Sequence, residues 1–252
     1  MKLISKISTA SVSVALAATM SGAPAASATP VSTTASLSVS AASCTKVKLQ
    51  QNSTHKACVR LAQAQMKRAG IPVSVDGIFG VGTVNAVVNF QRQQKLSDDG
   101  VIGAGTWSRL IKPRPVDKSF PSVCKSRGVN ICVDQGQRKL FHFKNGKLQK
   151  TVAVRTGGFT KNKNGKWFVH RTQKGTFMLR AKALHVLSNA YDVDLPYSLM
   201  FNRVTGEYIH QSNDFARNGY AGSSHGCVNV ASTANAKWLY VNTPLGSKVT
   251  VY

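Results

Sequence analysis

A cysteine and two histidines in the C-terminal half of the chain are the residue types that nucleophilic chemistry requires. Cys227 directly follows Gly226, and His225 lies two residues before the cysteine. His210 lies further upstream. A thiol is a strong nucleophile only as the thiolate, and a nearby imidazole can accept its proton. Such a pair would perform acyl transfer: the thiolate attacks an amide, a thioester forms, and water or an amine captures the acyl group.

The loop between His210 and Cys227 must bring the two side chains together. His210 ends a strand-like run, and the loop after it is rich in glycine and serine, which allows the chain to fold back. At hydrogen-bond distance the imidazole would lower the pKa of the thiol. Gly226 would let backbone N–H groups approach the substrate carbonyl closely, as in an oxyanion hole.

Two other interpretations of these residues remain open at this point. His210, His225 and Cys227 are residue types that bind zinc, although the sequence offers no fourth ligand and no C-x-x-C pair. Cys227 could also be an inert buried cysteine, which the flanking Ser224 and His225 disfavour. The other four histidines lack such a context and are interpreted as surface or core residues: His55, His142, His170 and His185.

The chain has five cysteines, so one is left over if the others form disulfides. The first four fall into two local pairs, Cys44 with Cys58 and Cys124 with Cys132. Four cysteines allow three pairings, and local pairing is the simplest of them. It leaves Cys227 free, which favours a functional use for this thiol.

The N-terminus predicts export. Lys2 and Lys6 form a positive region, residues 7–20 carry no charge, and Ala26-Ser27-Ala28 is typical of a signal-peptide cleavage site. We therefore expect a signal peptide at residues 1–28 and a secreted, cell-wall protein. The uncharged stretch is too short for a transmembrane helix, which needs about 20 apolar residues, and no later stretch could anchor the chain in a membrane.

The charge balance restricts the possible partners. The chain carries 33 Lys and Arg against 9 Asp and Glu, a net charge of +24, which falls to +22 when Lys2 and Lys6 are removed. This charge fits a nucleic-acid-binding protein or a secreted protein among anionic cell-wall polymers. Export and the absence of any nucleic-acid-binding motif favour the wall polymers and no nucleic acid.

A small helical unit is expected after a Ser/Thr/Ala-rich linker at residues 29–56. Helical spacing starts near residue 57, and an internal repeat follows, in which residues 76–83 match residues 99–106 at an offset of 23. The glycines of the repeat suit tight turns with positive φ, and Thr83 and Thr106 could each cap the following helix. The pattern predicts a three-helix domain at residues 57–112.

This unit resembles the peptidoglycan-binding domain of bacterial wall enzymes. The resemblance is carried by the two Asp-Gly turns, the Phe90-Gln91 pair and the Thr106-Trp107 pair, in that order. It implies binding to wall glycan or to a stem peptide. A purely structural bundle without binding activity is the alternative, because fold alone does not establish function.

A mainly β domain is expected at residues 128–252, after a proline-containing linker at 113–127. Residues alternate in hydrophobicity around 139–144, and Asn145-Gly146 is a strong hairpin signal. Further strand-like runs follow, and residues 248–252 could close the sheet. Only residues 231–240 look clearly helical.

The Ser224–Asn229 motif, with His210 upstream, resembles the signature of the L,D-transpeptidase (YkuD) catalytic domain, whose fold is a β-sandwich. The resemblance implies that Cys227 is the nucleophile, that His210 is its base and that His225 supports the oxyanion. The backbone carbonyl of Gln211 would hold the His210 tautomer. Further residues that the resemblance places in the oxyanion or substrate site are Ser224, Gly226, Gln211, Asn229, Tyr208, Met200 and Phe201.

The resemblance also implies a reaction. The donor would be a peptidoglycan tetrapeptide stem that loses its terminal D-Ala, the acceptor a side-chain amine of a neighbouring stem, and carbapenems would acylate the thiol. No cofactor or metal is expected, and the sequence does not predict the oligomeric state. The alternatives are an L,D-carboxypeptidase that uses water as acceptor, and a non-catalytic wall-binding protein. The family's Thr-Pro-x-Gly-x-Phe segment has Gln173 in place of proline, which puts the rigidity of that loop in doubt.

Overall fold

The computed structural model describes residues 41–252 of the chain. The predicted signal peptide and residues 29–40 of the predicted linker at 29–56 lie outside these residues. Buried apolar side chains form one core in the helical part and a separate main core in the β part. We call these parts the helical module and the β module.

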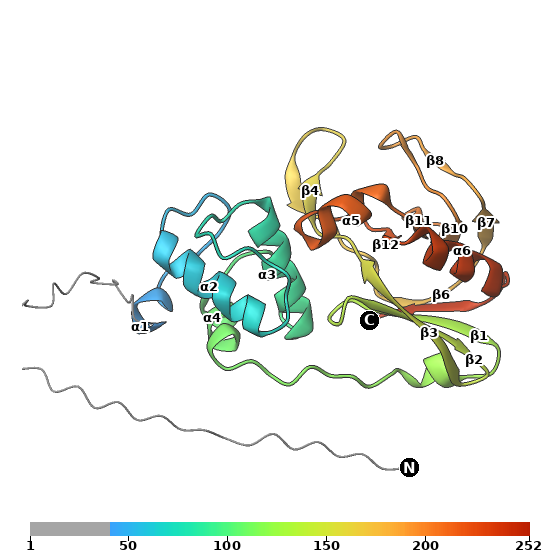
Figure 1. The fold of residues 1–252 in the computed structure, drawn as a ribbon, viewed down its shortest axis with the longest axis horizontal. Helices are drawn as coiled ribbons and strands as arrows, with labels where there is room; N and C mark the ends of the chain where they lie inside the picture. Colours follow the sequence, from blue (N-terminus) through green and yellow to red (C-terminus); the bar gives the residue numbers. More distant parts are fainter. Residues whose placement is uncertain (1–40) are drawn as a thin grey trace, which may run out of the picture. The chain divides into compact units, whose positions relative to one another are not determined.

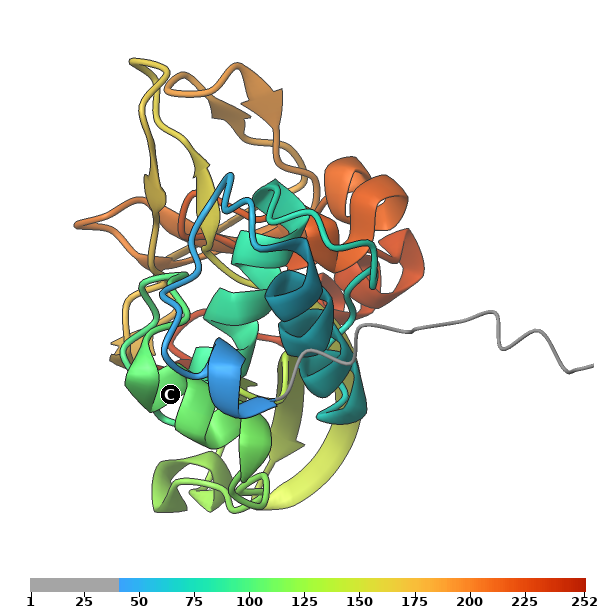
Figure 2. The same ribbon diagram turned by 90° about the vertical axis from the view of Figure 1, so that its left-hand side faces the viewer.

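The helical module contains the three predicted helices, α2 (Lys56–Arg68), α3 (Val81–Gln93) and α4 (Ala104–Ile111), preceded by the short α1 (Ala41–Cys44). Figure 2 shows the three longer helices, and their buried side chains form one core. The core also contains Cys44 and Leu49, and the indole of Trp107 donates a hydrogen bond to the carbonyl of Val47 at 2.8 Å. Chain before residue 57 therefore contributes to this core.

The internal repeat is organised by one buried glutamine in each half. The Gln63 amide donates to Asp76 Oδ1 at 2.8 Å and to Thr83 Oγ1 at 3.0 Å. Gln91 makes the same two kinds of bond to its own turn, at 2.7 and 3.2 Å. The prediction that Thr83 and Thr106 cap the helices is wrong. Gly80 and Gly103 occupy the cap positions, and the threonine hydroxyls lie inside the first turn, bonded to these glutamines.

The β module is built on one nine-stranded sheet in the order β6-β13-β1-β2-β3-β12-β11-β10-β7 (Figure 1). Two short ribbons, β4-β5 and β8-β9, stand apart from it. The strands span the following ranges: β1 Val129–Asp134, β2 Lys139–Lys144, β3 Lys147–Arg155, β4 Phe159–Lys161, β5 Trp167–Val169, β6 Gly175–Met178, β7 Ala181–Ala183, β8 Leu187–Ser188, β9 Val193–Asp194, β10 Ser198–Asn202, β11 Glu207–Gln211, β12 Val228–Val230 and β13 Lys248–Val251.

Several predicted features of the β module are confirmed. Asn145 and Gly146 form the β2–β3 turn with φ values of 50° and 76°, which suits a two-residue hairpin with both central φ positive. The C-terminal run forms the predicted strand, β13, which lies between β1 and the edge strand β6. The predicted helix is α6 (Thr233–Asn242), and it adds Ala236 and Leu239 to the main core.

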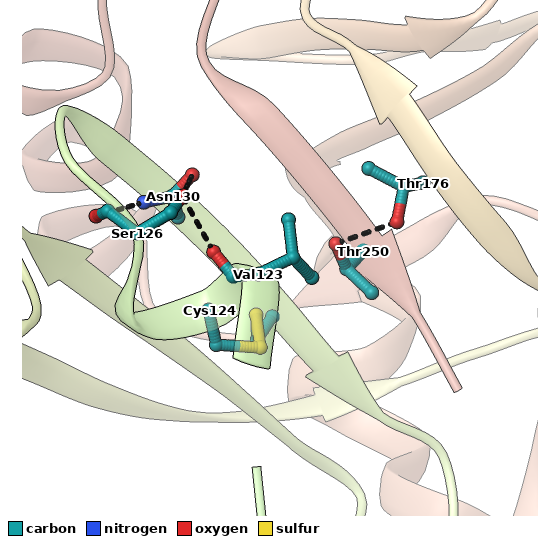
Figure 3. The surroundings of a disulfide bond; sticks show 7 residues. Val123, Cys124, Ser126, Asn130, Thr176 and Thr250 are labelled. Carbon is teal, nitrogen blue, oxygen red and sulfur yellow. Dashed lines mark hydrogen bonds between the residues drawn. A yellow bond between two sulfur atoms is a disulfide. The ribbon is translucent and has the colours of Figure 1, made fainter. Parts of the chain in front are cut away.

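Both local disulfides are present, Cys44–Cys58 and Cys124–Cys132. The second joins the short 3-10 helix η1 (Ser122–Lys125) to β1, as Figure 3 shows. Beside it, the Asn130 amide donates to the carbonyl of Ser126 at 2.9 Å. The disulfide and this hydrogen bond therefore attach the segment that precedes β1 to β1 itself.

Candidate active site

Two neighbouring strands carry the predicted base and nucleophile. β11 and β12 pair in parallel, with His210 opposite Asn229 and Ile209 opposite Val228. Side chains two residues apart in a strand point to the same face. Tyr208 therefore shares the face of His210, and its backbone forms a hydrogen bond with the thiol of Cys227, which lies immediately before β12.

The loop between these strands is more ordered than the sequence indicates. It contains α5 (Asn213–Asn218) and a 3-10 turn, η2 (Gly219–Ala221). The Ser212 hydroxyl caps α5 by accepting a hydrogen bond from the N–H of Phe215 at 3.1 Å. This compact crossover returns the chain parallel to β11, which is the connection that parallel strands require.

The sheet separates the predicted substrate residues onto two faces. Met200 and Tyr208 are cross-strand partners, and Tyr208 shares the face of His210. Phe201 points the opposite way. It is 2% exposed, lies in the main core and contacts Phe177 with ring centroids 5.6 Å apart. The placement of Phe201 in a substrate pocket is therefore corrected: it is a core residue, because neighbouring residues of a strand alternate between faces.

The His210 imidazole is held at both nitrogens. Nδ1 lies 2.6 Å from the carbonyl oxygen of Gln211, and Nε2 lies 2.9 Å from the Asn229 amide nitrogen. An amide N–H donates to Nε2 only if that nitrogen is unprotonated, so Nδ1 carries the proton and donates to Gln211. Burial lowers the pKa of His210 to about 4. The ring is therefore a neutral imidazole near neutral pH, with its acceptor nitrogen on the site face.

Arg155, at the end of β3, holds the Asn229 side chain in this arrangement. It was not predicted as a site residue. Its Nη2 donates to Asn229 Oδ1 at 3.0 Å and to Asp214 Oδ2 at 2.5 Å. Its Nη1 donates to the carbonyl of Gly219 at 2.9 Å. Arg155 thus links the crossover loop to the amide that contacts His210. One basic residue among 33 carried no signal of this role in the sequence.

The Cys227 thiol is kept protonated by its surroundings. Burial raises its pKa to about 11, and the nearby Glu207 carboxylate adds to this rise, while a hydrogen bond from the Tyr208 backbone opposes it. Glu207 is itself buried. It accepts hydrogen bonds from the Gln173 N–H and the Asn202 amide, both at 3.0 Å. The sequence gave no indication that this carboxylate lies beside the thiol.

The residues before Cys227 form a tight loop closed by Ser224. The Ser224 hydroxyl donates to the carbonyl of Cys227 at 2.5 Å and accepts from the N–H of Gly226 at 3.2 Å. Gly226 has a φ of 123°, and a Cβ there would lie 3.1 Å from Glu207 Oε1, so glycine is required. Its N–H, predicted to bind the oxyanion, is bonded within the loop in this structure.

His225 contacts the two short hairpins, β4–β5 and β8–β9. Its Nε2 lies 2.8 Å from the carbonyl of Lys161 in the β4–β5 hairpin. Its ring stacks on Tyr191, with centroids 3.7 Å apart, and meets the edge of the His170 ring at 4.8 Å. His225 therefore joins two hairpins over the site. Neither Tyr191 nor His170 was singled out in the sequence.

A cavity of about 890 Å³ lies apart from this chemistry. Its lining includes residues of 92–98, 116–121 and 171–174, and neither His210 nor Cys227 borders it. We therefore locate the reactive centre from the thiol and its hydrogen bonds, and not from cavity size.

Among the described residues, Cys227 is the free cysteine. None of the helices in residues 41–252 combines the length and apolar character of a membrane span. Over the same range, no three His, Cys, Asp or Glu side chains gather in a way that could hold a metal ion. A half-buried thiol directly before β12 and a neutral imidazole on the adjacent strand β11 are the two groups that general-base activation of a cysteine requires.

Both modules match known domain families. Residues 128–251 match the L,D-transpeptidase catalytic domain (YkuD), and residues 56–110 match a peptidoglycan binding domain.

Solved structures with similar chains include further proteins of the same description. The L,D-transpeptidase of Xylanimonas cellulosilytica is 26% identical, with 81% of this chain and 97% of that chain covered and a TM-score of 0.42. That of Stackebrandtia nassauensis is 25% identical, with 77% and 90% covered and a TM-score of 0.43. An L,D-transpeptidase from Mycobacterium smegmatis is 23% identical over 49% of this chain and 58% of that chain, with a TM-score of 0.41.

Proposed function

Because residues 128–251 belong to the L,D-transpeptidase catalytic domain family, we propose that this chain is an exported enzyme that cross-links peptidoglycan stem peptides through a thioester on Cys227. The donor is a tetrapeptide stem that is cleaved between its diamino acid and the terminal D-Ala. The acceptor is the side-chain amine of a neighbouring stem. The observation that carries the proposal is the neutral His210 imidazole on β11, the strand whose Tyr208 backbone contacts the Cys227 thiol.

Acylation begins with transfer of the thiol proton to His210 Nε2. Because Asn229 donates to this nitrogen at rest, the hydrogen bond must break as the proton arrives. A pKa of about 11 for the thiol and about 4 for the imidazole disfavours a resting ion pair. Proton transfer therefore accompanies formation of the bond between sulfur and the donor carbonyl carbon. The tetrahedral intermediate then expels D-Ala, whose amine takes the proton from His210.

Deacylation reverses the same steps with a new nucleophile. The acceptor amine attacks the thioester carbonyl, loses a proton to His210 Nε2, and the thiolate leaves. The imidazolium then returns its proton to the sulfur. The hydrogen bond from His210 Nδ1 to the Gln211 carbonyl holds the required tautomer throughout.

The remaining features of the chain support work at the cell wall. The helical module matches a peptidoglycan binding domain, and the net charge of +22 that remains without Lys2 and Lys6 would hold the protein near anionic wall polymers. The N-terminal segment has the pattern of a signal peptide, which would deliver the enzyme to its substrate.

The test is mass spectrometry of disaccharide-tetrapeptide monomers incubated with the protein from residue 29 onward. A dimer linked between two diamino acids, with release of D-Ala, supports transpeptidation. Tripeptide and D-Ala without dimer would identify the carboxypeptidase, and unchanged monomers would favour a wall-binding protein. Cys227→Ala should abolish the reaction and leave wall binding intact, whereas Arg68→Ala, at an exposed position of α2, should change neither.

Acylation by a carbapenem provides a second test of the nucleophile. Intact-mass measurement should show one covalent adduct, and peptide mapping should locate it on Cys227. An adduct on any other residue, or on the Cys227→Ala variant, would contradict the assignment of the thiol.

A further inference from the structure

Residues 156–159, which connect β3 to β4 and include the first residue of β4, lie against the loop that carries the nucleophile. Gly157 forms a parallel bridge with Ser224. The N–H of Gly158 donates to the carbonyl of Ser224, and the N–H of Ser224 donates to the carbonyl of Thr156, both at 3.3 Å. We call residues 156–159 the strap. Its position fixes the backbone three residues before the reactive sulfur.

The opposite side of the strap is held by the helical module. The Asn85 side chain of α3 is 2% exposed. Its Oδ1 accepts from the N–H of Phe159 at 2.7 Å, and its Nδ2 donates to the Phe159 carbonyl at 3.2 Å and to the Ala221 carbonyl at 3.1 Å. Asn85 therefore bonds both the strap and the crossover loop between base and nucleophile.

Arg92, two turns further along α3, forms hydrogen bonds with the other end of the strap. Its Nη1 donates to the carbonyl of Gly157 at 2.5 Å and to the Thr156 hydroxyl at 3.1 Å. Its Nε pairs with Asp98 at 2.8 Å, and the second oxygen of Asp98 pairs with Arg171 of the β module at 2.8 Å. Hydrogen bonds to Asp98 of the helical module and to Thr156 and Gly157 of the β module thus hold the Arg92 guanidinium in position.

Thr172 provides a second connection between the strap and the nucleophile loop, at Gly226. The Thr172 hydroxyl accepts from the N–H of Gly157 at 2.9 Å and donates to the carbonyl of Gly226 at 2.6 Å. Close packing also couples the parts sterically. A Cβ on Gly158 would lie 2.6 Å from Asn85 Oδ1 and 2.8 Å from Ser223 Cβ. A shift of the Asn85 side chain would therefore be transmitted through Gly158 to the loop that carries Cys227.

The internal repeat shows that α3 does not need these side chains for its own fold. Gln63 and Gln91 make matching bonds in α2 and α3. Aligning the helices on these glutamines, 28 residues apart, pairs Asn85 with Ala57 and Arg92 with Ala64. The first half of the repeat folds with alanine at both positions. Asn85 and Arg92 therefore serve the contact with the strap and not the helix.

We propose that Asn85 and Arg92 are positioning residues for Cys227, so that the helical module is a working part of the catalytic centre as well as a wall-binding unit. The inference rests on the proposed function for its catalytic consequence. The coupling itself does not depend on which acyl acceptor the enzyme uses.

Asn85→Ala and Arg92→Ala in the full chain test the proposal, because each introduces the residue of the matching repeat position. The matched controls are Asn89→Ala, one turn along α3 from Asn85, and Arg68→Ala on the exposed face of α2. For the two test variants we expect kcat for cross-linking to fall at least tenfold with KM changed less than twofold. Arg92→Lys, which keeps one charged donor, should recover part of the loss.

Hydrogen–deuterium exchange gives a readout independent of turnover. Peptides covering the strap and residues 223–228 should exchange at least threefold faster in both test variants and at the wild-type rate in both controls. Iodoacetamide should alkylate Cys227 at least threefold faster, because a loosened loop admits water to the buried thiol. Unchanged exchange and unchanged kcat in a folded Asn85→Ala variant would overturn the proposal, as would equal effects in the controls.

Two further outcomes remain decisive. Wild-type protein that forms neither dimer nor tripeptide would defeat the proposed function, and the exchange and alkylation results would still decide the coupling. If Asn85→Ala does not fold, Asn85→Asp keeps the acceptor for the Phe159 N–H and loses both donated bonds. This variant should then show faster exchange around residue 221, and wild-type exchange there would reject the role of Asn85.

Discussion

At the scale of single residues, the site rests on opposite pKa shifts in His210 and Cys227. Burial stabilises the neutral form of each group, so the base loses proton affinity and the thiol gains it. Reaction therefore requires the His210 imidazole unprotonated and does not require a resting thiolate. The pH dependence of catalysis should therefore show the shifted pKa values of these two groups and not their ordinary pKa values.

We expect the acid limb of kcat/KM to lie near pH 4, below the ordinary value of 6.5 for histidine. Below about pH 4, protonated His210 cannot accept the thiol proton. The same shift affects stability: the contribution of neutral His210 is present above pH 6.5 and is lost as the pH falls toward 4. The measurement is a pH–rate profile with thermal unfolding at each pH. An acid limb at pH 6.5 would contradict the assignment of His210 as the buried base.

Glu207→Gln should lower the pKa of Cys227 from its value of about 11, because it removes the negative charge beside the thiol. The rate of iodoacetamide alkylation as a function of pH measures this shift, and its midpoint should move to lower pH. The control is Asp192→Asn, which removes an exposed carboxylate and should leave the midpoint unchanged. A midpoint that stays in place in Glu207→Gln would show that Glu207 does not act on the thiol.

At the scale of elements, the repeated turns and the β2–β3 hairpin were predictable because local chemistry determines them. Gly77 and Gly100 adopt φ values of 78° and 76°, as their sequence positions indicated. The helix α5 was missed because it is short and polar, and only its Ser212 cap gave a signal. The burial of Phe201 was missed because the strand face depends on tertiary pairing, which spacing within one strand cannot decide.

Some residues of the site were likewise predictable from the sequence, and others were not. Cys227, His210 and Asn229 came from the motif, and the sheet register pairs His210 with Asn229. Arg155 comes from a distant strand and Glu207 from the same strand as His210, and the roles of both depend on burial. The sequence alone could not identify them, because an isolated arginine or glutamate has no pattern that distinguishes a buried partner from a surface charge.

The Cys124–Cys132 disulfide should stabilise the entry of the β module. Replacing both cysteines by serine should lower the free energy of unfolding by about 2–3 kcal/mol, because the closed loop is short. Urea unfolding measures this loss. The matched comparison is Cys44→Ser with Cys58→Ser, which opens a longer loop and should cost slightly more by the same reasoning. An unchanged unfolding midpoint in the first variant would mean that η1 is held by its hydrogen bonds alone.

At the scale of the whole molecule, the net charge of +22 that remains without Lys2 and Lys6 should make binding to cell walls depend on salt. Raising the salt from about 0.1 M to about 1 M shortens the screening length from about 10 Å to about 3 Å. Sedimentation of the protein with purified walls should therefore decrease with salt. A remaining salt-resistant fraction is expected from the helical module. Binding that is equal at both salt concentrations would show that the surplus charge does not contribute.

The buried state of Cys227 also bears on how the protein endures beside its own disulfides. Thiol–disulfide exchange proceeds through the thiolate, and a thiol with a pKa of about 11 presents very little of it near neutral pH. We therefore expect slow exchange between the free Cys227 and the two disulfides of the same chain. Attack by peroxide also requires the thiolate, so the same raised pKa should slow oxidation of the sulfur. A thiol that is inert at rest would extend the lifetime of the enzyme wherever oxidants are present.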